Sequence, residues 1–276
     1  MRGKKGLGKK WLYIPAFFLL GVALYPYLYM VFNSLAPWDE VDKGFIPHSF
    51  TLRSYKWLLF GEEGVATKPW IGAFFNSLLV TTVSTLLMMV FGALIAFALA
   101  KVDFRGRRQV NAFIMFQMFF PSMILLIPTF LVVKTLGFSN TYLAMIIPKA
   151  LSLWAVFLYT NFFKALPDEI VEAARIDGAS TMRIIWKIVL PMSRSITTII
   201  FLFLFMERWV ELLWDMIAVK DIELQTINVL LAQMFGPYEA YPGPMYAGTV
   251  ILTFPILILF IIFRKNFTKG IQFVLK

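Results

Sequence analysis

Charged side chains within one apolar stretch are the first residues of this chain whose types and spacing could do chemistry. Residues 195–219 are mostly apolar, yet they include three carboxylates and one guanidinium. These charged residues are Glu207, Arg208, Glu211 and Asp215. A carboxylate accepts hydrogen bonds from hydroxyl groups, and the indole of Trp214 offers an apolar face to a polar ring. The stretch therefore has the chemistry needed to bind a polar solute without reacting with it.

On one continuous helix these charges share a face. At about 100° per residue, the four charged residues and Trp214 fall on one arc of roughly 120°, with Trp209 nearly opposite. A charge within a long apolar segment requires water or a partner, so two interpretations are open. The arc lines a solute pathway, or it forms ion pairs with a second subunit, with Arg208 balancing Glu211. Lys149 is expected to pair with one of these carboxylates or to extend to the outer surface. The candidate pathway residues are Glu207, Glu211, Trp214 and Asp215.

A short charged run, EAARIDGAST at residues 172–181, interrupts the apolar sequence and is the second candidate. Pro167 suits the first position of a helix, and the two acidic residues that follow it complement the positive end of that helix. Gly178 can adopt the left-handed conformation that ends a helix. We therefore predict a short helix at 167–177, outside the bilayer.

A second helical segment is predicted after the glycine. Ser180 or Thr181 can cap its start, and Pro191 turns the chain toward the membrane. Its apolar residues recur at helical spacing. They are Met182, Ile185, Trp186 and Val189. From spacing alone, this helix-turn-helix fits a functional element and an ordinary amphipathic surface loop equally well.

The composition places the chain in a bilayer. Of its 276 residues, 59% are hydrophobic and only 15% are charged, far from the balance of a soluble domain. Cysteine is absent and His48 is the only histidine, so disulfides and thiolate metal sites cannot form and a histidine metal site is not expected. The net charge of +10 lies in short clusters between apolar stretches, as membrane orientation requires, which disfavours a nucleic-acid-binding role.

No segment predicts catalysis. The N-terminal GKKGLGKK has the glycine and lysine spacing of a phosphate-binding loop, but Lys10 stands where a magnesium-binding Ser or Thr is required. Too few residues precede Gly3 to form the strand that such a loop needs. The sequence also contains no GxSxG elbow, no zinc-ligand spacing and no paired-carboxylate site with a nearby base. We therefore expect no catalytic residue and no metal in this chain, and we interpret the N-terminal charges as an orienting basic arm.

Six apolar windows are long enough to span a membrane, for which about 20 residues are needed. Four of them are free of charged residues, and two contain charges. We predict an all-α polytopic membrane protein with a single transmembrane domain over residues 1–276. The predicted helices cover approximately 11–33, 72–100, 109–133, 141–163, 195–219 and 244–264, with a polar loop at 164–194.

The basic residues predict the orientation of these helices. Alternate loops carry 18 Lys and Arg residues on one side and 6 on the other. Because basic loops stay in the cytoplasm, both termini and the loop 164–194 are expected there. The first apolar stretch is longer than a signal-peptide core and lacks an obvious small-residue cleavage site, so we expect it to be retained as a helix.

The segment FFKALPDEIVEAARIDGASTMRIIWKIVLP, residues 162–191, resembles the EAA loop of type I ABC importer permeases. That family's pattern is EAA, then DGA, then a hydrophobic residue and LP. The matching residues are Glu172, Ala173, Ala174, Asp177, Gly178, Ala179, Ile188, Leu190 and Pro191. Further similarity, to the carbohydrate-uptake subgroup, lies in NSLLVTTVST from Asn76, ALAKVDFRGR from Ala98, LLIPTFLVVKTLGFSNTYLAMIIP from Leu125 and FPILILFIIFRKNF from Phe254.

The resemblance implies a six-helix permease subunit of a prokaryotic cell membrane, with both termini in the cytoplasm. It implies a second, related permease as partner, and an extracytoplasmic solute-binding protein that delivers a sugar. It also implies two cytoplasmic ATPase subunits that bind ATP and magnesium, so that this chain needs no cofactor of its own. In this family the EAA helix inserts into a cleft of the ATPase and transmits its closure. The residues implied for ATPase coupling are Glu172, Ala173, Ala174, Asp177, Gly178, Ala179, Ile188 and Pro191.

Two parts of the sequence depart from the family pattern. The fifth helix reads WVELLWD, with Val210 and Asp215 where the family often has Asn and Pro, and the tail KGIQFVLK lacks the usual glycine-rich end. Other cargoes, such as glycerol-phosphate, a peptide or a metal chelate, stay open, although the acidic fifth helix disfavours an anion. A stand-alone secondary transporter is a second function class, but the paired interrupted helices of an inverted repeat are not apparent.

Overall fold

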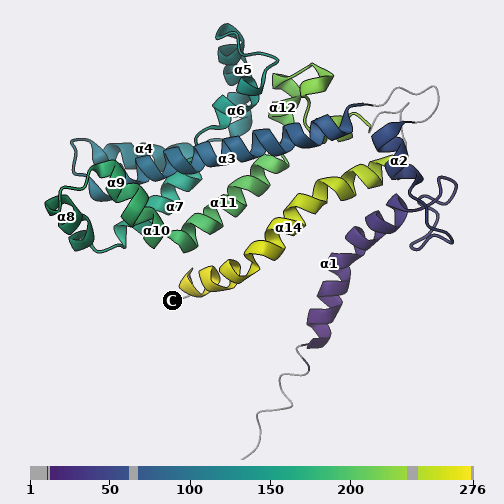
Figure 1. Cartoon of the computed structure of the whole chain (residues 1–276), viewed down its shortest axis with the longest axis horizontal. Coiled ribbons are helices and arrows are strands. Elements are labelled where there is room, and N and C mark those ends of the chain that lie inside the picture. Colours follow the sequence, from purple (N-terminus) through teal and green to yellow (C-terminus); the bar gives the residue numbers. More distant parts are fainter. Residues whose placement is uncertain (1–10, 12, 62–67, 235–241, 275–276) are drawn as a thin grey trace, which may run out of the picture. The chain divides into compact units, whose positions relative to one another are not determined.

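The computed structural model describes residue 11 and residues 13–61, 68–234 and 242–274, with side chains up to Arg264. Every regular element within these ranges is helical, as the sequence predicts (Figure 1). The chain separates into two compact units, Met1–Trp70 with Leu230–Pro255, and Ile71–Val229 with Ile256–Lys276. Each unit therefore brings together segments that are far apart in the sequence.

The first unit contains α1 (Tyr13–Ser34), α2 (Arg53–Phe60) and the first part of α14 (Pro242–Val274). The loop after α1 is tied to both long helices, because the Asp42 carboxylate accepts hydroxyl hydrogen bonds from Tyr29 at 2.9 Å and Tyr246 at 2.6 Å. Most of the apolar side chains of α1 are exposed. Such a surface is expected of a helix that contacts lipid or another subunit.

The second unit contains most of the elements. In chain order they are α3 (Trp70–Lys101), α4 (Arg107–Met118), η2 (Ser122–Leu125), α5 (Leu126–Thr135), α6 (Tyr142–Ile146), η3 (Ile147–Lys149), α7 (Leu153–Lys164), α8 (Asp168–Ile176), α9 (Thr181–Ile184), the π-helical η4 (Ile185–Val189), α10 (Leu190–Met192), α11 (Arg194–Trp209), α12 (Leu213–Ala218) and η5 (Ile222–Leu224). One more helix, α13 (Ile227–Ala232), crosses the boundary between the units.

Four helical segments of the described ranges are long and apolar enough to cross a membrane. They are Tyr13–Ser34, Trp70–Lys101, Tyr142–Lys164 and Pro242–Arg264. Two further segments pass the same test only as bent pairs: α4 meets the η2–α5 segment at 96°, and Thr181–Met192 meets α11 at 88°. By length and composition, the described part of the chain therefore has four candidate spans, or up to six if each bent pair is counted as one span. This range includes the six predicted helices, although the second bent pair begins within the predicted polar loop 164–194.

Three of the predicted helices are interrupted. The window 109–133 breaks at Pro121, because a proline lacks the amide hydrogen of a helix and disfavours the α conformation before it. The window 141–163 contains the short η3 turn, after which Ser152 caps α7 by accepting a backbone hydrogen bond at 3.3 Å. The window 195–219 is divided between α11 and α12. Each break is therefore a correction to a helix predicted from apolar length alone.

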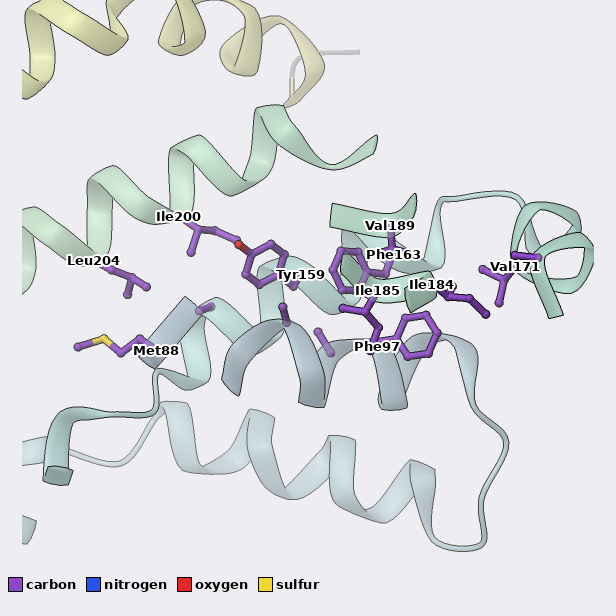
Figure 2. Packing of buried hydrophobic residues seen from close by; sticks show 14 residues of the cluster. Met88, Phe97, Tyr159, Phe163, Val171, Ile184, Ile185, Val189, Ile200 and Leu204 are labelled. Atoms are coloured by element: carbon purple, nitrogen blue, oxygen red, sulfur yellow. The ribbon is translucent and has the colours of Figure 1, made fainter. Parts of the chain in front are cut away.

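A buried apolar core joins α3, α7 and α11 to the segment that contains α8, α9 and η4 (Figure 2). The figure shows a row of side chains that runs from Leu204 past Tyr159 and Phe163 to Ile184 and Val171. The helices α3 and α7 approach closely, since a Cβ on Gly92 would lie 3.1 Å from that of Ala155. Because such cores are close-packed, a displacement of α8 is expected to reach the long helices.

Candidate functional site

The end of α8 is fixed by a complete glycine-terminated capping motif. Gly178 has a φ of +76°. Its amide donates to the Arg175 carbonyl at 3.0 Å, and the Ala179 amide donates to the Ala174 carbonyl at 2.9 Å. This pair of bonds is the Schellman arrangement, which satisfies the free carbonyls of a helix end. The structure therefore places the predicted helix at Asp168–Ile176 and gives Gly178 the predicted left-handed conformation.

The two faces of α8 carry different residues. Val171 and Ala174 are buried, and Val171 lies at the end of the row of apolar side chains in Figure 2. On the exposed side lie Glu172 and Ala173, and Ile176 has 87% of its surface exposed. The two neighbouring alanines thus have separate roles. The small side chain of Ala173 adds little bulk to the exposed face of α8, whereas the small side chain of Ala174 lets α8 pack against the core of its own chain.

A lysine at the end of α3 holds the start of α8. The Lys101 ammonium donates to the Leu166 carbonyl at 2.6 Å and pairs with the Asp168 carboxylate, and only 2% of the lysine side chain is exposed. Near the other end of α8, Arg175 donates to the Lys101 carbonyl at 3.3 Å. The Lys101 ammonium lowers the pKa of Asp168 from its ordinary value, so this carboxylate is charged at neutral pH. We call these contacts the Lys101 clip.

The segment after the turn begins as predicted, and of the predicted apolar stripe Ile185 and Val189 are buried in the core. Ser180 caps α9 and accepts a backbone hydrogen bond at 3.4 Å. Met182 and Trp186, however, are 55% and 45% exposed, while Ile184 is completely buried. From Ile185 on, the π-helical turn Ile185–Val189 departs from the 3.6-residue register on which the stripe was predicted, whereas Met182 lies before this turn.

The eight candidate coupling residues divide between the surface and the interior. The exposed members are Glu172, Ala173, Asp177, Gly178 and Pro191. The members that pack against the core are Ala174, Ala179 and Ile188. At the end of the segment the Ser193 hydroxyl donates to the Val189 carbonyl at 2.7 Å, just before the 88° bend into α11. One side of the loop is thus exposed, and its other side packs against the core of the second unit.

The second candidate site lies at the break between α11 and α12. The helix α11 ends at Trp209, and the Asn228 side-chain amide donates to the carbonyl of that residue. Glu211 accepts a hydrogen bond from the Trp214 amide at 3.2 Å and so satisfies a free donor at the start of α12. Because the helix is interrupted here, the predicted single arc of about 120° does not describe these residues.

Two ion pairs within the chain stabilise this break. Arg208 and Asp215 form a bidentate pair at 2.8 and 3.0 Å, with 2% of each side chain exposed. Arg208 also donates to the Met145 carbonyl at 3.3 Å. Lys149 pairs with Glu211 at 2.7 Å, which confirms one of the two predicted alternatives for this lysine. The partner of Arg208 is therefore Asp215 in its own chain, and Glu211 has a different partner.

Only two of the four candidate pathway residues are accessible. Glu207 is exposed and Glu211 is half-buried. Trp214 and Asp215 are each 2% exposed, and the Trp214 indole nitrogen donates to the Ala144 carbonyl at 3.0 Å. In this conformation Trp214 and Asp215 are buried, so Glu207 and Glu211 are the two of the four candidates that a solute could reach.

Two residues that stabilise these sites, Lys101 and Asn228, are not singled out as candidates by the sequence. Lys101 counts in the sequence only as a basic loop residue, and Asn228 has no assigned role. Their partners lie 65, 67 and 19 residues away in the chain. Local spacing therefore carries no signal for either contact.

Comparison with known proteins identifies the family. Residues 88–272, which include the whole loop 164–194, match the inner membrane component of binding-protein-dependent transport systems. The chain belongs to this family. The arabinooligosaccharides transport system permease protein AraQ of Halalkalibacterium halodurans is 30% identical over 267 residues, 95% of this chain and 94% of that protein. The polygalacturonan/rhamnogalacturonan transport system permease protein YtcP of Bacillus subtilis is 31% identical, over 90% of this chain and 91% of that protein.

The fold agrees with this family. A chain in the crystal structure of a bacterial ABC transporter, one involved in the import of the acidic polysaccharide alginate, superposes with a TM-score of 0.81. The two chains are 24% identical, and the match covers 96% of this chain and 99% of the other. The protein thus has the type I ABC importer permease fold. It is a multi-pass permease of the cell membrane and a transport subunit, not an enzyme.

Proposed function

We propose that this permease is a transmembrane subunit of an ATP-driven importer for an oligosaccharide or a related carbohydrate. The similarity to AraQ and YtcP supports this cargo, because both are named for oligosaccharide or polysaccharide transport and both align along at least 90% of this chain. In the proposal, the permease pairs with a second, related permease and forms half of the translocation pathway. An extracytoplasmic solute-binding protein delivers the sugar.

The observation that supports the coupling proposal is that the outer face of α8 is exposed while its inner face is held by the core and by the Lys101 clip. Glu172 can accept charge-assisted hydrogen bonds, and the exposed Ile176 offers apolar surface beside it. In the proposal, each permease docks onto one of two cytoplasmic ATPase subunits through this face. The ATPases bind ATP and magnesium, and this chain holds no cofactor.

Packing within the second unit provides a route from α8 to the membrane helices. Val171 and Ala174 connect α8 to the buried core, and the Lys101 clip connects it to α3. The core continues to Ile200 in α11, whose other end carries the buried Arg208. In the proposal, ATPase closure displaces α8, and this route carries the displacement to the broken helices where the accessible glutamates lie.

A stand-alone carrier is the weaker alternative. In a proton- or sodium-driven carrier, carboxylates within the membrane would relay protons or bind sodium. Glu211 and Asp215 instead have cationic partners within the chain, Lys149 and Arg208. These pairs favour a structural role for both carboxylates, and they support the importer.

Site-directed cross-linking tests the docking proposal. Ile176→Cys introduces a single thiol into the cysteine-free permease, within the complete transporter in membranes. We expect a thiol-to-amine cross-linker to join this position to an ATPase subunit. Ile222→Cys, at an exposed site in η5, is the control and is expected to give no such product. Equal cross-linking at both positions, or none at Ile176→Cys, contradicts the proposal.

The cargo is tested on the purified transporter with its co-purified binding protein. We expect neutral oligosaccharides, such as arabinose-containing ones, to raise the melting temperature of the binding protein and to be imported by the reconstituted complex. Glycerol-phosphate is the alternative cargo that the sequence leaves open. A binding protein stabilised by glycerol-phosphate and by none of the sugars contradicts the carbohydrate proposal while leaving the coupling proposal intact.

A further inference from the structure

A basic cavity lies beside the connection between α3 and α4. Its volume is about 700 Å³, and its lining includes four basic side chains and one carboxylate. These five residues are Arg105, Arg107, Arg108, Lys164 and Asp103. Asp103 is paired with Arg107 at 2.8 Å, and Arg107 also donates to the Ala100 carbonyl at 3.3 Å. The acidic residue of the cavity is therefore already used by one of the arginines.

The other three basic side chains give the cavity its charge. Arg105, Arg108 and Lys164 have no ion-pair partner among the side chains that the structure describes. All three are exposed. A concave site with three such cations has the charge and the donors to hold a phosphate, and each guanidinium can form two parallel hydrogen bonds to it.

The cavity lies where two membrane spans end. The apolar span Trp70–Lys101 ends just before it, and the span Tyr142–Lys164 ends with one of its lining residues. Basic residues at the end of a span lie at the level of the lipid headgroups. Three cations at this level attract the headgroups of anionic lipids.

Apolar surface continues from the cavity along α4. Gln109 lines the cavity, and Phe113 and Phe116 follow it at spacings of four and seven residues on the same face of the helix. These two rings are 64% and 68% exposed. A basic headgroup site thus adjoins exposed rings that suit an acyl chain, an arrangement that a site for a free anion does not need.

We propose that this cavity binds an anionic phospholipid. Arg105, Arg108 and Lys164 bind its phosphate, and an acyl chain lies along Phe113 and Phe116. The inference depends on neither the cargo nor the ATPase partners nor the orientation of the chain, because the site is defined within the second unit alone.

The first experiment measures lipid affinity by native mass spectrometry of the purified transporter. The probes are phosphatidylglycerol and zwitterionic phosphatidylcholine. The variant combines Arg105→Gln with Arg108→Gln, and the control combines Lys134→Gln with Lys220→Gln, two exposed lysines outside the cavity. We expect phosphatidylglycerol binding to weaken roughly 25-fold in the variant, because each of the two basic side chains near a charged membrane contributes about fivefold. The control is expected to stay within about twofold. Equal weakening in both pairs, or equally tight phosphatidylcholine binding, overturns the proposal.

A second experiment leaves the basic residues intact and so stays informative if the arginine variant fails to fold. A fluorophore is attached at Gln109→Cys in nanodiscs containing phosphatidylglycerol with a quencher on its headgroup. We expect strong quenching there, weak quenching for the same label at Lys134→Cys, and no change with excess inorganic phosphate. Equal quenching at the two positions shows no specific site. Loss of quenching with inorganic phosphate shows a site for a soluble anion. Either result overturns the lipid proposal.

Discussion

At the scale of single residues, the contact between Arg208 and Asp215 explains how the chain keeps a charge within its interior. Both side chains are almost fully buried and form two parallel hydrogen bonds. The gain from such a pair over apolar residues is small, since both charges lose their water. Removal of one partner is much more costly, because the other charge is then buried without compensation. The ion pair therefore stabilises the break between α11 and α12 by joining residues on either side of it.

The first prediction concerns this ion pair. Asp215→Asn is expected to destabilise the permease by about 3–5 kcal/mol, because Arg208 loses its counter-charge. The loss is measured as a lower melting temperature of the detergent-purified transporter. Glu207→Gln is the control, since this exposed carboxylate is expected to change stability by less than about 0.5 kcal/mol. A melting temperature of Asp215→Asn equal to that of the control contradicts the structural role.

Several residues of the site were predictable because their signals are local. Gly178 has the left-handed conformation that its position after a short helix indicates, and Ser180 caps the next segment. Lys149 has a carboxylate partner, as a charge within a span requires. The partner of Arg208 was not predictable, because helical spacing applies only while a helix continues, and this one ends at Trp209.

At the scale of elements, the support of α8 depends on the Lys101 clip. The lysine joins the start of α8 to the end of α3 through a carbonyl and a carboxylate. Most of the Asp168 side chain is exposed, so the ion pair is screened by water and contributes less than the partly buried hydrogen bond to Leu166. Pairing with Lys101 lowers the pKa of Asp168 from its ordinary value, so the contribution of the ion pair is complete at neutral pH and is lost only as the pH falls through the lowered value.

The second prediction tests the clip. Lys101→Met keeps the length of the side chain and removes its donors, so the backbone amides of α8 are expected to exchange with deuterium about fivefold faster. Amides in the middle of α3 are expected to keep their rates. Lys187→Met, at an exposed lysine in η4, is the matched control. If α8 exchanges equally fast in both variants, the clip does not support the helix.

The elements themselves were predictable to different degrees. Apolar length located the spans, but it did not show where they break. A local signal was present at Pro121, since a proline within an apolar window indicates an interrupted helix. At Trp209 the signal is distant, because Asn228 provides the hydrogen bond at the helix end. The π-helical turn after Ile184 was likewise not predicted from the apolar spacing.

At the scale of the whole molecule, the distribution of basic residues supports the proposed orientation of the chain in the membrane. Basic residues number 18 on one set of alternate loops and 6 on the other. In the proposal, both termini and the loop 164–194 therefore face the cytoplasm. The composition and the apolar windows already indicated a multi-pass membrane protein, and the family match confirms this.

The third prediction tests this orientation with single cysteines in the cysteine-free chain. Ser49→Cys and Arg183→Cys both lie at exposed positions. An impermeant thiol reagent is expected to label the first only from outside the cell and the second only from the cytoplasmic side. Reaction of both positions from the same side contradicts the proposed topology.

Coupling between the loop and ATP hydrolysis is the central claim, and sugar-stimulated ATPase activity of the purified transporter tests it most directly. Gly178→Val places a β-branched residue at a φ of +76°, and Glu172→Lys reverses the exposed charge on α8. Gly137→Val and Glu223→Lys make the same changes elsewhere, at another left-handed glycine and another exposed carboxylate. At both glycines a Cβ has open space, so each Gly→Val substitution adds backbone strain without a clash between the new Cβ and neighbouring atoms. We expect the two loop variants to insert normally, to lose co-elution with the ATPases and to lose stimulated hydrolysis, while the two control variants retain both. Full ATPase association and full stimulation in both loop variants would show that residues 164–194 are only a surface connection.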